Sequence, residues 1–149
     1  MGMTVAYEAK LDTNQRHALE RLLFFNGCQS RVLQHIVDVI DEYGVPEIVR
    51  DGNALRVTVG DLQGVQSLFA IDSVTRRPLG VAVYVRADHE HVTVLHVGVA
   101  EECCAGGPRE GLMLLLRLLR ELRRTSRRLR GVRRVKILYG SPRLDASAG

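Results

Sequence analysis

The sequence has few of the features of a secreted or membrane protein. Its apolar runs are short, and the longest of them, such as Leu112 to Leu116, end at arginine well before the ~20 residues that a membrane span needs. The first residues lack a basic segment followed by an apolar core, the pattern of a secretory leader. We therefore expect a protein without membrane spans, located in the cytoplasm.

Cysteine is also scarce. The three cysteines, Cys28, Cys103 and Cys104, form no CxxC pair, and neighbours in sequence rarely form an unstrained disulfide. This usage fits a reducing compartment. Cys103 or Cys104 could act as a nucleophile beside a helix N-terminus, but neither has an identifiable base, so the sequence favours small buried side chains at both positions.

Lysine is nearly absent, and charge is divided unevenly. Residues 1–106 carry nine basic and 14 acidic side chains, net −5, whereas residues 107–149 carry 12 basic and three acidic side chains, net +9. Such an asymmetry can mark a face that binds a polyanion. All basic residues except Lys10 and Lys136 are arginines, however, which equally predicts ordinary solvated helix faces. No aromatic residues lie between Arg117 and Arg134 to stack on bases, so we expect no specific nucleic-acid binding.

Length and composition are those of one globular domain. The chain has 149 residues, of which 46% are apolar and 26% charged, so a single sizeable core is expected. We predict one domain over residues 1–140 and a flexible tail over residues 141–149.

Hydrophobic periodicity predicts the first half of the chain. A short strand is expected at Thr4 to Lys10, followed by a helix that Asp12 caps and that ends near Asn26. A second helix is expected from Ser30 to Tyr43, where apolar residues recur at helical spacing before Gly44 and a proline.

The second half changes to strand periodicity. Four strands are expected, joined by short polar connections into an antiparallel meander: 54–59, 65–72, 79–86 and 92–99. Pro108 then opens a helix to about Arg127, and a last strand follows from Val135 to Tyr139. The residues that we expect to face inward on this helix are Leu112, Leu115, Leu116, Leu119 and Leu122.

This order of elements resembles the GNAT acyltransferase superfamily over nearly the whole chain. The resemblance implies an α+β (α/β) fold in one domain, with a mixed, mostly antiparallel sheet flanked by helices. It also implies acetyl-coenzyme A (acetyl-CoA) as cofactor and an amine, on a small molecule or a protein, as acceptor.

The resemblance also implies a cofactor site behind the strand at 92–99. In that family a splayed strand leads into a glycine-rich loop and a helix whose backbone N–H groups hold the pyrophosphate, and an exposed helix N-terminus suits an anion on physical grounds alone. The family's motif consists of Arg or Gln, any two residues, Gly, any one residue, and then Gly or Ala. When the motif is placed to end at Gly111, only this last position matches. The implied cofactor-binding residues are Gly106, Gly107, Arg109, Glu110 and Gly111.

The catalytic residues follow from the same resemblance. Direct acetyl transfer needs a base for the amine proton and an acid near the departing thiolate. Glu101 and Glu102 follow the strand where the family often has its base, and Tyr139 is the tyrosine nearest to the position of its acid. The family's C-terminal helix and hairpin are missing, so an edge or a face of the sheet is expected to be uncovered and to form a homodimer.

Other candidate sites are weaker. His89 and His91 could meet a metal from one strand face, but no third ligand is apparent, and a polar hairpin tip explains them better. His96 lies among valines, where a core histidine is the better interpretation. Two other functions stay open: a noncatalytic binding or assembly module of the same fold, and a basic nucleic-acid-binding protein.

Overall fold

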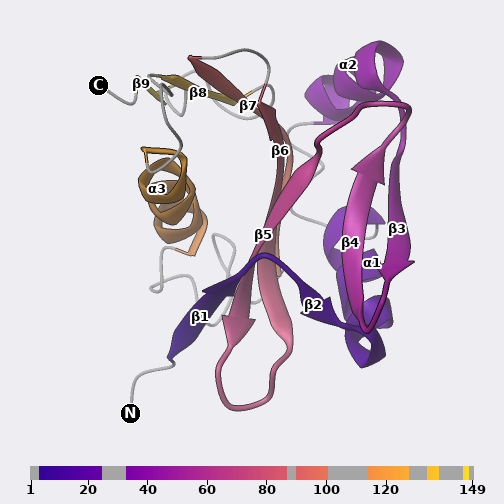
Figure 1. Cartoon of the computed structure of the whole chain (residues 1–149), viewed down its shortest axis with the longest axis vertical. Helices are drawn as coiled ribbons and strands as arrows, with labels where there is room; N and C mark the ends of the chain where they lie inside the picture. Colours follow the sequence, from indigo (N-terminus) through magenta and orange to yellow (C-terminus); the bar gives the residue numbers. More distant parts are fainter. Residues whose placement is uncertain are drawn as a thin grey trace.

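The computed structural model describes residues 4–24, 33–86, 90–100, 114–127, 134–137 and 146–147. Within these ranges the chain forms an α+β fold of mostly antiparallel sheet and helices, as the sequence predicted (Figure 1). No helix in the same ranges is long and apolar enough to span a bilayer.

Among the described residues, the main sheet has six strands in the order β1-β5-β6-β7-β8-β9. Neighbouring strands run antiparallel except β7 and β8, which are parallel. The bounds of the strands are β1 Val5–Glu8, β5 Gln66–Asp72, β6 Pro78–Arg86, β7 His91–Val99, β8 Arg134–Ile137 and β9 Ala146–Ser147. The meander β5-β6-β7 is the part of the sheet that alternation in the sequence predicted. Two residues of the segment predicted as a tail, Ala146 and Ser147, pair with β8.

A second sheet of three strands has the order β2-β4-β3. Its strands are β2 (Leu11–Asp12), β3 (Pro46–Asp51) and β4 (Ala54–Val59). The expectation that residues 54–59 begin the main meander is wrong, because β4 pairs with β3 and β2 instead. Pro46 is compatible with β3 because it is the first residue of a strand at the edge of the sheet.

In the part of the chain that the structure describes, three α-helices flank the main sheet: α1 (Arg16–Phe24), α2 (Leu33–Tyr43) and α3 (Leu114–Arg127). A 3-10 turn, η1 (Thr13–Gln15), precedes α1, and Asp12 stands at its N-cap without a side-chain cap hydrogen bond. The carboxylate of Asp12 lies instead 3.9 Å from Nε of Arg76. The capping role predicted for Asp12 is therefore wrong, since an ion pair with Arg76 takes its place.

The predicted inward face of α3 is confirmed at Leu119 and Leu122, which are buried, and is wrong at Leu116. Leu114, Leu118 and Leu122 are fully buried, whereas Leu116 is 44% exposed. Residues four apart lie on one side of a helix, so the row of leucines from Leu114 defines the buried face. Leu116 was expected to face inward and points away from that row.

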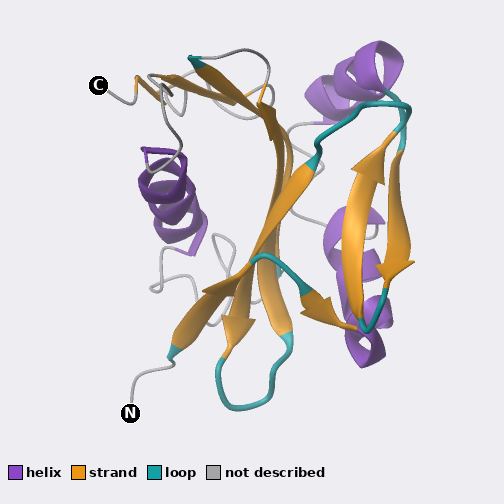
Figure 2. Ribbon diagram, viewed as in Figure 1, coloured by secondary structure: helices purple, strands orange, loops and turns teal. Residues whose placement is uncertain are grey.

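Helix α3 lies on one side of the main sheet, and α1, α2 and the small sheet lie on the other (Figure 2). The buried apolar side chains accordingly form two cores, one on each side of the main sheet. The α3-side core lies between α3 and one face of the sheet. The α1-side core joins the opposite face to α1, α2 and the small sheet. Members of the α3-side core include Leu68, Ala70, Val92, Val94, Leu114, Leu118 and Leu122. Members of the α1-side core include Leu19, Leu22, Val39, Leu55, Val57, Phe69, Val81, Val83 and Leu95.

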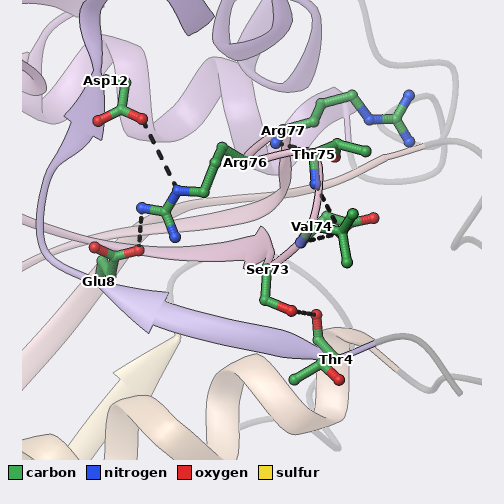
Figure 3. A network of polar contacts seen from close by, with 9 residues as sticks. Thr4, Glu8, Asp12, Ser73, Val74, Thr75, Arg76 and Arg77 are labelled. Carbon is green, nitrogen blue, oxygen red and sulfur yellow. Dashed lines mark hydrogen bonds and ion pairs between the residues drawn. The ribbon is translucent and has the colours of Figure 1, made fainter.

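A polar network ties the N-terminal segment to the turn between β5 and β6 (Figure 3). The guanidinium of Arg76 lies 2.5 Å from a carboxylate oxygen of Glu8 on β1. The N–H and the hydroxyl of Ser73 both donate to the carbonyl of Thr4, each over 3.0 Å. These contacts join segments that lie far apart in the sequence, so they fix the position of β1 at the edge of the main sheet.

Candidate functional site

The residues predicted to bind the cofactor and to catalyse transfer lie outside the described residues. Glu101 and Glu102 follow the last described residue after β7, and the predicted cofactor-binding residues, Gly106, Gly107, Arg109, Glu110 and Gly111, belong to the same segment, 101–113. Tyr139 lies in the segment 138–145, which is likewise not described. The structure does describe the elements on either side: β7 before the first segment, α3 after it, and β8.

The end of β7 lies between two helices that approach it closely. At Gly98 a Cβ would lie 2.6 Å from the carbonyl oxygen of Leu22 on α1. On the other face, a Cβ at Gly80 of β6 would lie 3.3 Å from a methyl of Leu118 on α3. The N–H of Ala100 donates to the carbonyl of Leu79 over 2.8 Å, so pairing with β6 continues to the last described residue before the candidate loop. Ala100, the last described residue before the segment 101–113, is therefore hydrogen-bonded to the main sheet.

Strand β7 contains a β-bulge next to the last residue that pairs with β8. Val83 of β6 is opposite His96, and the next residue, Tyr84, is opposite Val94, so Leu95 is an extra residue in β7. Parallel pairing with β8 runs from His91 to Val94. A bulge of this kind bends a strand and re-aims the side chains that follow it. The segment of β7 that leads toward the candidate loop therefore begins at this bulge.

Two buried polar side chains lie near the bulge on one face of the main sheet. Ser67 of β5 and His96 of β7 are both opposite Val83, which belongs to the α1-side core. Each is 4% exposed. Adjacent strands are about 4.8 Å apart, so two strand spacings, about 10 Å, separate Ser67 from His96. Among the described residues no group donates to or accepts from the Ser67 hydroxyl.

The environment of His96 disfavours the charged imidazolium. Burial lowers the pKa of His96 from 6.5 to about 4. The imidazole is therefore neutral at physiological pH and can accept a proton only as a weak base. The prediction that His96 is a core histidine is confirmed by this burial.

Sequence reasoning did not single out Ser67. Its only signal is a hydroxyl residue in a strand, at a position that alternates with the apolar residues Val65 and Phe69 on the inward face. Tyr84, which lies on the other face, is partly buried, and burial raises the pKa of its hydroxyl. In the described part of the chain, no three His, Cys, Asp or Glu side chains are grouped so as to hold a metal ion.

The described elements around the candidate loop are rich in positive charge. Strands β6 and β7, the described residues that flank them in the sequence, and α3 contain two carboxylates, Glu90 and Glu121, against seven arginines. Five of those arginines belong to α3. These described elements therefore carry a net positive charge, which attracts anions over the range that salt does not screen.

No model of a known protein family matches this chain, and no curated protein matches it. Among solved structures, the chain is similar to one described as the crystal structure of nourseothricin acetyltransferase. The two are 17% identical, with a TM-score of 0.34, over 74% of this chain and 63% of that one. The chain thus spans less than two thirds of the length of that protein. The α+β fold rests on the order of the strands and helices described above.

Proposed function

We propose that this chain is an N-acyltransferase that takes an acetyl group from acetyl-CoA and transfers it to an amine on a small molecule or a protein. The observation that supports this proposal is the arrangement of β7, α3 and β8. The parallel strands β7 and β8 are joined through α3, and the glycine-containing segment from Gly106 to Gly111 lies in the sequence between the end of β7 and the start of α3.

General physical chemistry favours an anion site at this junction. In open sheets, ligands bind outside the carboxyl ends of parallel strands. A helix N-terminus adds unpaired N–H donors and the positive end of the helix dipole. The excess of arginine over carboxylate in β6, β7 and α3 favours an anionic ligand such as a pyrophosphate, and it has to outweigh the three carboxylates of the candidate segment itself, Glu101, Glu102 and Glu110.

Each site residue has a distinct role in the proposal. Backbone N–H groups around Gly106 and Gly107 hold the pyrophosphate, and Arg109 adds a charged contact. Glu101 or Glu102 accepts the proton of the acceptor amine, and the Tyr139 hydroxyl donates a proton to the departing thiolate. Acetyl-CoA supplies the activated thioester. His96, which is neutral and buried in β7, adds no positive charge to that strand.

A binding titration tests the proposal directly. We expect isothermal titration calorimetry to show binding of acetyl-CoA to the wild-type chain, and Gly107→Glu to weaken it at least about tenfold, because the new carboxylate occupies the phosphate space and repels the phosphates. Gln63→Glu adds the same charge at an exposed loop residue and should bind like wild type.

The possible outcomes distinguish whether the chain binds acetyl-CoA from where it binds acetyl-CoA. No heat of binding with wild type at millimolar acetyl-CoA would rule out the transferase and leave a noncatalytic module of this fold. Equal binding by wild type and Gly107→Glu would place the cofactor elsewhere in the chain. Thermal melts of both variants distinguish lost binding from lost folding.

A further inference from the structure

Two helices carry outward faces of opposite charge. On α2 the acidic stripe consists of Val37, Asp38, Asp41 and Glu42, all exposed. On α3 the basic stripe consists of Leu116, Arg117, Arg120 and Arg124, which are exposed or half-buried. The acidic stripe therefore combines one large apolar side chain with negative charges, and the basic stripe combines one with three positive charges, beside which Glu121 is the one carboxylate in the described part of α3.

The apolar residues in the two stripes are unusual for this surface. Val37 is 41% exposed and Leu116 is 44% exposed, and both are among the four large hydrophobic residues that are exposed in the described part of the chain. In each stripe a charged residue lies four positions later, Asp41 after Val37 and Arg120 after Leu116, and therefore on the same side of its helix. An apolar contact and an ion pair could thus form together between the stripes.

The two stripes cannot meet within one molecule. Val39 of α2 packs in the α1-side core, whereas Leu118 of α3 packs in the α3-side core on the opposite face of the main sheet. Figure 1 shows α2 and α3 on opposite sides of that sheet. Since both stripes point away from the sheet, any contact between them requires two molecules.

We propose that the basic stripe on α3 of one molecule binds the acidic stripe on α2 of a second copy of this chain. The contact is heterologous, because it joins two different surfaces. Each molecule in a pair keeps one unused stripe, so association continues to longer chains or closes into a ring. This inference does not depend on the proposed acyltransferase activity.

The strength of the contact follows from its composition. Exposed ion pairs contribute little individually, and Arg124 already has an ion pair of 3.8 Å with Glu121. Two short helix faces cover less area than a typical stable interface. We therefore expect a dissociation constant on the order of 10⁻⁴ M at low ionic strength, with strong weakening by salt, since exposed charges are screened.

Sedimentation of the wild-type chain at about 200 μM provides the first test. At about 20 mM NaCl we expect a weight-average mass above the 16.6 kDa monomer, and at about 500 mM NaCl we expect monomer. A monomer at both salt concentrations overturns the proposal. Association that persists unchanged at high salt also overturns it, because it indicates an apolar interface elsewhere.

Charge reversal locates the contact. We expect two double variants to be monomers at low salt. The first carries Arg117→Glu and Arg120→Glu on α3, and the second carries Asp41→Lys and Glu42→Lys on α2. In each variant both stripes then carry the same sign. Mixed in equal amounts, the two variants should associate again, because each offers a stripe opposite in charge to one on the other. Failure of the mixture to associate, with both variants folded by circular dichroism, contradicts the proposal.

A matched control guards against effects of net charge. Arg21→Glu with Arg56→Glu changes the charge by the same amount as reversal on α3, at exposed residues outside both stripes, and should associate like wild type. Loss of association in this control overturns the proposed location. A titration with duplex DNA tests whether the basic stripe binds nucleic acid instead of a second copy of the chain. If the wild-type chain stays monomeric and binds DNA, and the Arg117→Glu with Arg120→Glu variant does not bind DNA, the basic stripe is a nucleic-acid site and the proposal is wrong.

Discussion

Gly98 marks the point where α1 lies directly on β7, since a Cβ there would be 2.6 Å from the carbonyl oxygen of Leu22. We predict that Gly98→Ala lowers the free energy of unfolding by about 2–3 kcal/mol, because backbone must shift to relieve the overlap. Gly80→Ala is the matched control. Its Cβ would meet a flexible methyl of Leu118 at 3.3 Å, so its effect in urea denaturation should be within about 1 kcal/mol. Equal losses in the two variants would mean that α1 does not constrain β7.

His96 makes stability depend on pH. Its pKa is about 4 in the folded chain, against 6.5 for an unperturbed histidine, so below pH 6.5 the unfolded chain binds a proton that the folded chain does not. This contribution is fully present above pH 6.5 and is lost as the pH falls toward 4. Between pH 7 and pH 4.5 we expect a loss of about 2–3 kcal/mol in wild type that His96→Gln does not show. Urea denaturation of both proteins at the two pH values measures the difference, and parallel pH profiles would refute it.

The sequence could locate some of these residues and not others. His96 was predicted to be in the core because valines surround it in a segment of strand periodicity. Ser67 was not singled out, because a hydroxyl in a strand can face either side and its partners across the sheet are set by register. The predicted site residues, from Glu101 to Gly111 and Tyr139, rest on the family resemblance and stay predictions, since they lie outside the described residues.

At the scale of elements, the turn between β5 and β6 depends on Asp72. A carboxylate oxygen of Asp72 accepts hydrogen bonds from the N–H groups of Val74 and Thr75 over 2.9 and 3.3 Å. We predict that Asp72→Ala lowers the free energy of unfolding by about 1–2 kcal/mol, because both donors lose their acceptor. Asp72→Asn keeps an acceptor oxygen and should lose less in the same thermal or urea melts. If the two variants are equally destabilised, the charge of Asp72 matters more than its hydrogen bonds.

Periodicity predicted the elements better than their partners. The alternation at 54–59 correctly indicated a strand with one buried face, but alternation says nothing about which strand lies beside it. The neighbour, β3, was not predicted, because Pro46 stands at its start and the preceding helix ends only at Tyr43. For α3, the dense run of leucines allows more than one inward face, and the packing of Leu118 against Gly80 selects the observed one.

At the scale of the molecule, the α1-side core should make the two sheets unfold together. Leu55 of the small sheet and Phe69 of the main sheet are buried in that same core. We predict that Leu55→Ala and Phe69→Ala each lower the free energy of unfolding by about 2–5 kcal/mol while unfolding remains one transition. The chain has no tryptophan, so tyrosine fluorescence and far-ultraviolet circular dichroism serve as the two probes. A two-step curve for Leu55→Ala would show that the small sheet is a separate cooperative unit.

The pairing of β1 with β5 also has a consequence for the newly made chain. Val5 is opposite Asp72, so the first strand of the main sheet is synthesised 67 residues before its partner is complete. At typical rates of about 5–20 residues per second, this corresponds to roughly 3–13 s on the ribosome. During that interval Val5 and Tyr7 lack the strand against which they pack. The N-terminal strand of the folded sheet is thus exposed to chaperones and to other nascent chains before β5 leaves the ribosome.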